Sequence, residues 1–449
     1  MSLPHPEAHS NSALQPYLQT ILHQPSIRRE GRVTQVIGHM IEATNPGCSI
    51  GSLCRILNPR DHSHVPAEVV GLRNEKILVM PLSHAYGIGP HCRIIAEDRP
   101  AMVPVGDSLL GRVFDPLMRP IDDLGDLATN QEIPLHPEVI NPLKRERIKE
   151  PLDVGVRSIN GTLTCGRGQR VGIMAGSGVG KSVLLGMMAR YTDADVNVIS
   201  LIGERGKEVR EFIEDNLGEE GLRRSVVVVA TSDQPPLLRM RGAYVATAIA
   251  EYFRNQGLDV LLSMDSLTRF AMAQREIGLA AGEPPTTKGY PPSVFAMLPL
   301  LLERAGTHQG EGSITGFYTV LVEGDDTNDP IGDAVRSIVD GHIVLSRDLA
   351  SKGVYPAIDV LLSSSRVMVD VVPKHFRQLS QIFRRTLATY SEAEDLINIG
   401  AYVQGSNPEI DYSLSKHSAI MEFLTQDMED HTSLTECEAR MQHMFGDRM

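Results

Sequence analysis

The chain has 449 residues, which predicts two or three domains, and its 42% hydrophobic and 22% charged residues are typical of a soluble enzyme. The formal net charge of −13 argues against a protein that binds the phosphate backbone of nucleic acids. No apolar run approaches the roughly 20 residues of a membrane-spanning helix, so we expect any membrane association to be peripheral. The five cysteines are odd in number and lack CxxC spacing, which predicts reduced thiols in a cytoplasmic protein.

The N-terminal segment, residues 1–25, is predicted to be an arm that carries one short amphipathic helix. Apolar residues recur at helical spacing from Leu14 to Leu22, and Pro25 ends the pattern. The helix either packs on its own domain or binds a partner protein, and the pattern alone favours neither.

Short apolar runs separated by turn residues fill residues 26–97 and predict a small β-barrel. The expected strands are Val33–Ile37, Leu53–Leu57, Val65–Val70, Ile77–Met80 and Arg93–Ile95. Residues 98–150 are rich in proline, glycine and charge, which predicts a linker that leads into a larger domain.

Apolar runs alternate with helical patterns from Gly155 to Pro373, which predicts a parallel sheet covered by helices and an α/β fold for residues 98–373. The expected strands are Val171–Met174, Val196–Ile202, Val226–Ala230, Val260–Met264, Ile314–Leu321 and His342–Leu345. The expected helices are Ser182–Arg190, Gly206–Asn216, Gly242–Asn255 and Ser293–Ala305. Strand patterns then vanish, which predicts a helical C-terminal domain over residues 374–449.

A glycine-rich turn joins the strand that ends at Met174 to the helix that follows it. Its glycines allow positive φ angles and aim consecutive N–H groups at one point, which suits phosphate oxygens. Lys181 is predicted to reach the β- and γ-phosphates, and the Ser182 hydroxyl is predicted to bind Mg²⁺. The strict P-loop pattern begins with glycine, whereas this chain has Ala175 there, but the glycines that shape the turn remain. The expected nucleotide-binding residues are Ala175, Gly176, Ser177, Gly178, Val179, Gly180, Lys181, Ser182 and Val183.

Two further strands run into carboxylates that suit phosphoryl transfer. The stretch Val260–Asp265 is apolar up to its end, so Asp265 at the strand tip is predicted to hold Mg²⁺ through water. Leu201 to Arg205 also runs from a strand into a charged turn, and Glu204 is the candidate for orienting and polarising the attacking water. An equally good interpretation makes Glu204 a cap for the helix that follows.

Three other side chains have roles that the sequence leaves open. Arg269 lies one helical turn beyond Asp265 and either reaches phosphate or pairs with that aspartate. Tyr355 precedes a proline that fixes the backbone, so its ring is a candidate platform for a nucleotide base. Arg366 follows three serines in an expected loop, and composition does not decide between a phosphate contact and a solvated side chain.

At these residues the sequence resembles the type III protein-export ATPases, which are relatives of the rotary ATP synthase α and β subunits. The block Pro356-Ala-Ile-Asp-Val-Leu-Leu-Ser-Ser-Ser365 matches the signature of those subunits. The stretches Gly168–Arg190, Met264–Ile277 and Pro284–Phe295 look like the export branch, within which Ala175 is no departure. The resemblance extends from about residue 26 to the C-terminus.

The resemblance implies a RecA-like P-loop ATPase core, ATP and Mg²⁺ as ligands, and a homohexameric ring with nucleotide at the subunit interfaces. It implies that Glu204 is the catalytic glutamate and Asp265 the Walker B carboxylate. The other implied contacts are Lys181 and Ser182 in the P-loop, Arg205 and Arg269 beside the γ-phosphate, Tyr355 against adenine, and Arg366 as a finger reaching the neighbouring subunit's nucleotide.

The resemblance further implies Mg-dependent ATP hydrolysis that energises or assists protein export, by a cytoplasmic protein peripheral at the inner membrane. The implied partners are a regulatory or stator protein at the N-terminal arm, a central stalk protein, an export gate and chaperone–substrate complexes, with no nucleic acid. Gly186–Thr192 and Gly400–Gly405 look more like flagellar than injectisome enzymes. The alternatives are an injectisome ATPase, a catalytically silent ring subunit that binds nucleotide, and an RNA translocase, against which the acidic composition argues.

Overall fold

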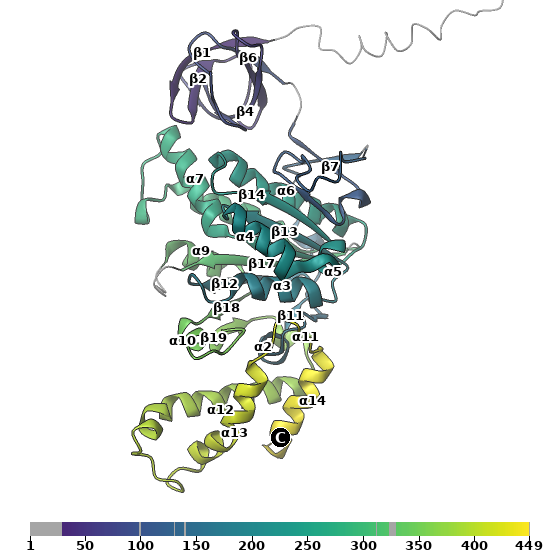
Figure 1. Ribbon diagram of the computed structural model, residues 1–449, viewed down its shortest axis with the longest axis vertical. Helices are drawn as coiled ribbons and strands as arrows, with labels where there is room; N and C mark the ends of the chain where they lie inside the picture. The colour runs from purple at the N-terminus through teal and green to yellow at the C-terminus, as the bar shows by residue number, and fades with distance from the viewer. Residues whose placement is uncertain are drawn as a thin grey trace, which may run out of the picture. The chain divides into compact units, whose positions relative to one another are not determined.

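The computed structural model describes residues 29–97, 100–129, 131–138, 141–310, 312–322 and 329–448 (Figure 1). The chain forms two compact units that divide between Arg99 and Pro100. The predicted helix from Leu14 to Leu22, and the whole 1–25 arm, lie outside the described residues.

The first unit is a closed β-barrel, which confirms the prediction for this part of the chain. Within residues 29–97 its strands are β1 (Glu30–Ile37), β2 (Met40–Thr44), β3 (Leu53–Leu57), β4 (His64–Arg73), β5 (Lys76–Pro81) and β6 (Arg93–Ala96). They close in the order β1-β2-β5-β4-β3-β6. Strand β4 shows why the barrel forms: Val65, Ala67 and Val69 are buried and alternate with partly exposed residues, so one face of each strand fills the interior.

All five predicted barrel strands are present, and β2 was not predicted. Its residues Met40–Thr44 pair with β1 across a turn at Gly38, whose φ of 57° is left-handed. The apolar run in this segment is short and is interrupted by one charged residue, so its sequence pattern does not predict a strand. The segment forms a strand because it pairs with both β1 and β5.

The second unit is built on one large sheet with the strand order β19-β18-β12-β17-β15-β13-β14-β8, and β16 pairs with β17 beside this path. The strands in the described part of the chain are β8 (Arg112–Phe114), β12 (Arg170–Ala175), β13 (Val196–Ile202), β14 (Ser225–Ala230), β15 (Val260–Asp265), β16 (Gly306–Thr307), β17 (Ser313–Leu321), β18 (Gly341–Leu345) and β19 (Ile358–Ser365). Neighbours from β18 to β8 pair in parallel, whereas β19 and β16 are antiparallel to their partners. Every residue of β13, β14 and β15 is buried, as expected of parallel strands covered on both faces.

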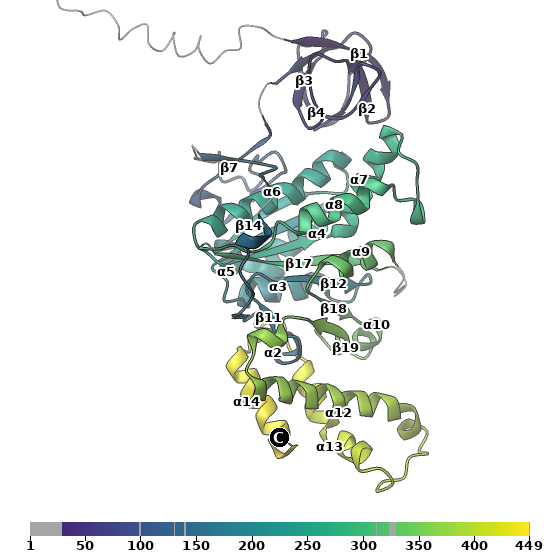
Figure 2. The same ribbon diagram turned by 180° about the vertical axis from the view of Figure 1, so that it is seen from behind.

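Helices cover both faces of this sheet, with α6 and α7 on one face and α3 and α5 on the other (Figures 1 and 2). The described helices that accompany the sheet are α2 (Arg157–Thr162), α3 (Lys181–Tyr191), α4 (Gly206–Glu211), α5 (Gly218–Arg223), α6 (Pro236–Asn255), α7 (Leu267–Ala281), α8 (Pro292–Leu302), α9 (Pro330–Ile338), α10 (Arg347–Ser351) and α11 (Met368–Val371). Between α4 and α5 lies a π-helical turn, η3 (Phe212–Leu217). The predicted α/β class is confirmed.

The remaining short elements of this unit are the strands β7 (Met102–Val105), β9 (Gln131–Pro134), β10 (Pro151–Leu152) and β11 (Cys165–Gly166) and the 3₁₀ turns η1 (Asp107–Leu109), η2 (Pro142–Lys144), η4 (Thr287–Gly289) and η6 (Gly446–Arg448). Strand β7 pairs with β9, and β10 pairs with β11.

The structure corrects three of the predictions for this unit. Residues 98–150 are not a linker, because β8 lies within them and extends the large sheet by pairing with β14. The serines before Arg366 lie in strand β19 rather than in a loop, since β18 supplies the ladder hydrogen bonds that their own propensity does not predict. Helix α6 begins at Pro236 instead of Gly242, because a proline is tolerated in the first turn.

The C-terminal helices α12 (Lys374–Asn398), α13 (Pro408–Leu424) and α14 (Leu434–Phe445) confirm the predicted helical end of the chain. Phe383 of α12 packs against Phe423 and Phe445, with ring centroids 5.3 Å and 5.8 Å apart. Arg157 of α2 ties this layer to the sheet unit, because its Nε donates to the Phe423 carbonyl at 3.0 Å and its main-chain N–H donates to Gln426 Oε1 at 2.8 Å.

All five cysteines are free, as the sequence predicted, and the structure shows that all five are buried. Among the helices that the structure describes, none is both long and apolar enough to cross a membrane.

Candidate active site

The P-loop turn lies where β12 ends at Ala175 and α3 begins at Lys181. Gly178 and Gly180 have φ angles of 78° and 87°, which only glycine adopts readily, so the turn requires them. No side chain caps the first turn of α3, so its N–H groups are free to bind an anion. The turn borders a cavity of about 740 Å³, whose lining is Ala175, Gly176, Ser177, Gly178, Gly180, Lys181, Ser182, Val183, Gly203, Glu204, Arg205, Glu208, Ser232, Arg269, Leu321, Val322 and Arg347.

Lys181 is held between two carboxylates that come from two other strands. Its Nζ lies 2.6 Å from Asp265 Oδ1 and 3.4 Å from Glu204 Oε1. Asp265 is the last residue of β15, and Glu204 follows β13, which pairs with β15 in parallel register. Parallel strands end at the same edge of a sheet, so the fold brings these residues together as the strand-end pattern predicted.

Burial and charge together set the proton affinities in this cluster. Burial lowers the pKa of Lys181, but Asp265 and Glu204 outweigh that effect and raise it, so the lysine is charged. Burial raises the pKa of Glu204 to about 7, with Lys181 opposing the shift and Asp265 and Glu208 adding to it. Glu204 therefore titrates near neutral pH, as do many groups that exchange protons in catalysis.

The helix-capping interpretation of Glu204 is wrong. Helix α4 begins after Arg205, which is its N-cap residue, and the Glu204 side chain bonds to the Lys181 ammonium and the Glu208 side chain rather than to a main-chain N–H of that helix. The Glu204 carboxylate instead faces Lys181 inside the cavity.

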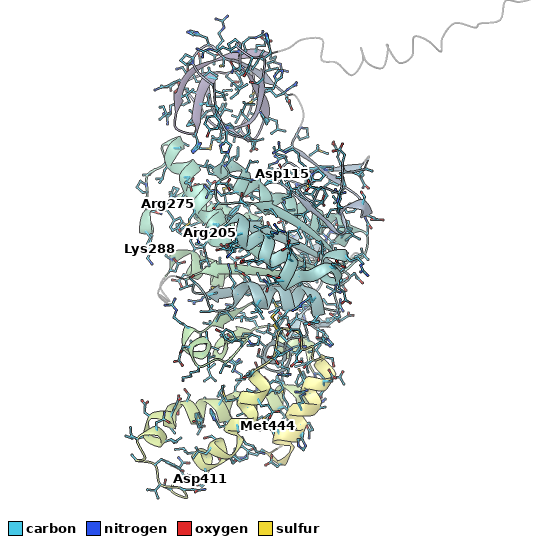
Figure 3. All side chains as sticks on the ribbon, viewed as in Figure 1. Asp115, Arg205, Arg275, Lys288, Asp411 and Met444 are labelled. Atoms are coloured by element: carbon cyan, nitrogen blue, oxygen red, sulfur yellow. The ribbon has the colours of Figure 1, made fainter. Side chains whose placement is uncertain are left out.

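Three arginines border the same cavity. Arg205, labelled in Figure 3, is exposed directly before α4, and Arg269 lies on the first turn of α7. The Arg269 Nε is buried without a hydrogen-bond partner among the described residues, and Asp265 pairs with Lys181 rather than with this arginine. Arg347, at the start of α10, was not predicted, although it too follows the carboxyl end of a parallel strand, β18.

Glu208 and Ser232 also line the cavity and were missed by the sequence analysis. Glu208 lies in the first turn of α4, and its side chain is hydrogen-bonded to that of Glu204. Ser232 follows β14, and its N–H donates to the Glu204 carbonyl at 3.0 Å. Strand-end position is the feature that would have pointed to Ser232.

Tyr355 lies against the P-loop. A Cβ atom built on Gly180 would be 3.4 Å from the Tyr355 ring, so the aromatic face borders the backbone at the start of α3. Tyr355 is 45% exposed as a residue, and its main-chain carbonyl accepts from the Gln426 N–H at 2.7 Å. An exposed ring beside the P-loop is the placement that a base platform needs.

Arg366 lies at the opposite edge of the sheet from its own P-loop. It follows β19, which runs antiparallel to β18, and its N–H donates to the Asp340 carbonyl at 3.0 Å. Asp340 accepts a hydrogen bond from Arg170, which is the first residue of β12. The P-loop follows Ala175, which is the last residue of the same strand. Five residue steps of about 3.3 Å separate these ends by about 16 Å, which is more than an arginine side chain reaches.

Three models of known protein families match successive parts of the chain. Residues 155–365 match the model of the ATP synthase alpha/beta family, nucleotide-binding domain, and residues 33–97 match that family's beta-barrel domain. Residues 372–443 match the T3SS EscN ATPase C-terminal domain.

The chain is 54% identical over 428 residues to the flagellum-specific ATP synthase of Bacillus subtilis (strain 168), covering 94% of this chain and 96% of that protein. The type 3 secretion system ATPase of Xanthomonas euvesicatoria is 53% identical over 400 residues, with 89% and 90% covered. The chain belongs to the family of flagellum-specific ATP synthases and type 3 secretion system ATPases. This confirms the resemblance found in the sequence, and the chain is an ATPase whose nucleotide is ATP.

Two solved structures of the assembled ATPase EscN from the type III secretion system of enteropathogenic E. coli, one of them in complex with its central stalk EscO, also resemble this ATPase. Their TM-scores are 0.87 and 0.85, their identities are 44% and 43%, and each match covers 92% of this chain and 99% of that chain.

Replacing Glu204 by glutamine is expected to change how the stability of the ATPase depends on pH. Between pH 4.5 and about 7 the folded chain keeps a proton on Glu204 that the unfolded chain has released, so the wild type loses stability as pH rises through this window. Glutamine has no such proton. The free energy of unfolding of Glu204→Gln relative to wild type should therefore rise by about 1–3 kcal/mol between pH 5 and pH 8.

Urea unfolding at the two pH values measures this difference. Glu211→Gln, which removes an exposed carboxylate from α4, the helix that follows Glu204, is the matched control. Parallel pH dependence in wild type and Glu204→Gln would contradict the raised pKa of Glu204.

Proposed function

We propose that this ATPase hydrolyses Mg-ATP at the P-loop cavity and thereby assists protein export by a flagellar type III secretion apparatus. The observation that carries the proposal is the position of Lys181, charged and held between Asp265 and Glu204 beside uncapped N–H groups. Such a site combines a phosphate cradle with a carboxylate that exchanges a proton near neutral pH.

Binding of the phosphates falls to the P-loop residues Ala175–Val183. All of them except Val179 line the cavity, and the first turn of α3 has no side-chain cap. The Lys181 ammonium is available to the β- and γ-phosphates. Of the side chains that the structure describes, Lys181 and Thr319 bond to Asp265, and both bonds fall on Oδ1. Oδ2 thus remains for a water bound to Mg²⁺, and Ser182, in the first turn of α3, lines the P-loop cavity. These oxygens fit Mg²⁺, which when bound neutralises charge on the phosphates.

Glu204 is proposed to orient and deprotonate the attacking water. Its carboxylate borders the cavity, and a pKa of about 7 allows it to accept a proton and return it at neutral pH. Arg205 and Arg269 supply positive charge beside the γ-phosphate, and the buried Nε of Arg269 has an unused donor there. Tyr355 is proposed to stack on the adenine, because its exposed ring adjoins Gly180.

Arg366 is proposed to act on the nucleotide of a neighbouring subunit in a homohexameric ring. Its place at the far edge of the sheet keeps it from its own P-loop, whereas its exposed side chain is open to a second copy. The similarity to assembled EscN supports an oligomer, and the EscN complex with EscO supports a central stalk partner.

Other partners follow from membership of the export family rather than from contacts in this structure. We assign a regulatory or stator protein to the 1–25 arm, and an export gate and chaperone–substrate complexes to the assembled ring. The protein would work in the cytoplasm, peripheral at the inner membrane. We set the domain boundaries at residues 26–97 for the barrel, 98–373 for the ATPase core and 374–449 for the C-terminal helices.

The flagellar assignment rests on the B. subtilis relative and on Gly186–Thr192 and Gly400–Gly405. An injectisome role is the second candidate, because the X. euvesicatoria type 3 secretion system ATPase is almost equally similar at 53% identity. Complementation of a flagellar export-ATPase deletion, compared with an injectisome one, separates the two.

Glu204→Gln is expected to keep Mg-ATP binding while losing hydrolysis. The amide preserves the shape of the side chain but removes the base, so the rate of phosphate release should fall by at least about 10²-fold. Equilibrium binding of a fluorescent ATP analogue and phosphate release measure the two properties separately. If binding and hydrolysis fall together, Glu204 has a structural role instead.

Arg366→Ala protein is expected to be inactive alone and to regain activity when mixed with Lys181→Ala protein. Some interfaces in mixed rings then join an intact P-loop to an intact arginine, and a guanidinium of this kind contributes about 10³–10⁵ in rate. Phosphate release by the mixture is the measurement, and a pull-down with differently tagged chains shows that subunits exchange. Mixed rings without activity, together with a wild-type specific activity that is independent of concentration, would contradict action in trans.

A further inference from the structure

Gln169, which directly precedes β12, and Arg170, the first residue of β12, hold the end of β19. Gln169 is fully buried, and its Nε2 donates to Ser365 Oγ at 3.2 Å and to the Asp340 carbonyl at 3.4 Å. Ser365 directly precedes Arg366, and the Asp340 carbonyl accepts from the Arg366 N–H at 3.0 Å. Gln169 therefore contacts both groups to which the main chain of Arg366 is attached.

Arg170 fixes Asp340 from its other side. Its main-chain N–H and its Nε each donate to Asp340 Oδ2 at 3.1 Å, and its Nη2 donates to Oδ1 at 3.3 Å. The Asp340 N–H returns a bond to the Arg170 carbonyl at 2.9 Å. The guanidinium also pairs with Glu303 at 2.5 Å, and the side chain is only 16% exposed, so Arg170 itself is held firmly.

Arg366 depends on this support, because its own side chain is barely anchored. It is exposed, and its guanidinium makes one long hydrogen bond, Nη2 to the Arg336 carbonyl at 3.4 Å, among the contacts of the described residues. It also follows an edge strand, β19, which has β18 as its partner on one side in the large sheet. A functional side chain on such an edge is placed accurately only if its main chain is fixed by neighbours.

We propose that Gln169 and Arg170 are positioning residues for Arg366, and that they act through Asp340 and Ser365 to aim it at the neighbouring subunit's nucleotide. The inference rests on the proposed action of Arg366 in trans. It gives β12 two roles. Its last residue leads into the P-loop, and its first residue supports Arg366, which acts at the neighbouring subunit's nucleotide site.

The test uses the mixed ring described above and adds one further substitution to only one of its two kinds of chain at a time. One chain carries Arg366→Ala and supplies intact P-loops, and the other carries Lys181→Ala and supplies intact Arg366. Arg170→Met, which keeps the side chain's stem but removes the donors, is added to one chain or to the other. A residue that positions Arg366 matters only on the chain that supplies Arg366.

We expect phosphate release to fall about 10- to 100-fold when Arg170→Met is on the Lys181→Ala chain. We expect it to stay within about twofold when the substitution is on the Arg366→Ala chain. Arg167→Met is the matched control, because Arg167 bonds to Asp193 and Asp259 at the same edge of the sheet but not to Asp340 or Ser365. Its effect should be the same on either chain.

Equal losses in both placements of Arg170→Met, or no loss in either, would overturn the positioning role. If Arg170→Met chains fail to enter rings in the pull-down, Gln169→Met is placed in the same two positions and decides the question by the same criterion. Absence of activity in the unmodified mixture, together with a wild-type specific activity that is independent of concentration, contradicts the trans role of Arg366 itself, so failure of the two proposals is distinguishable.

Discussion

The site depends on one buried ion cluster, in which a lysine at a helix start faces two carboxylates at strand ends. Asp265 and Glu204 would repel each other in a buried place without Lys181, which lies 2.6 Å and 3.4 Å from them. The parallel strands β13 and β15 bring the two acids to one edge, and β12 delivers the lysine through a turn that needs two left-handed glycines. Burial of this cluster raises the pKa of Glu204 to about 7 and so prepares it for proton exchange.

The parts of the site that are local in the sequence were predictable. A P-loop needs consecutive residues, and Asp265 stands at the end of an apolar strand, so both could be identified before the fold was known. Glu204 had two equal interpretations, and three-dimensional proximity to Lys181 was needed to exclude the capping role. Strands β8 and β19 and the cavity residue Arg347 escaped prediction because their identity comes from neighbours distant in the chain.

Each subunit in this account contributes to two nucleotide sites from opposite edges of one sheet. Tyr355 and the P-loop lie at one edge, and Arg366 lies at the other, about 16 Å away along β12. Strand β12 thus connects a subunit's P-loop with the residues that bond to the groups flanking Arg366. Gln169 and Arg170 fix the main chain at Arg366, because Gln169 bonds to Ser365 and Arg170 bonds to Asp340.

The most direct test of the central claim is the steady-state rate of phosphate release by Lys181→Ala protein. The account predicts that turnover disappears while circular dichroism and the melting transition show a folded chain, because Lys181 lines the cavity and pairs with Asp265 and Glu204 rather than packing in the apolar core. Lys207→Ala, which removes an exposed lysine of α4, should keep wild-type activity and is the control. Turnover of folded Lys181→Ala protein near the wild-type rate would contradict hydrolysis at this site.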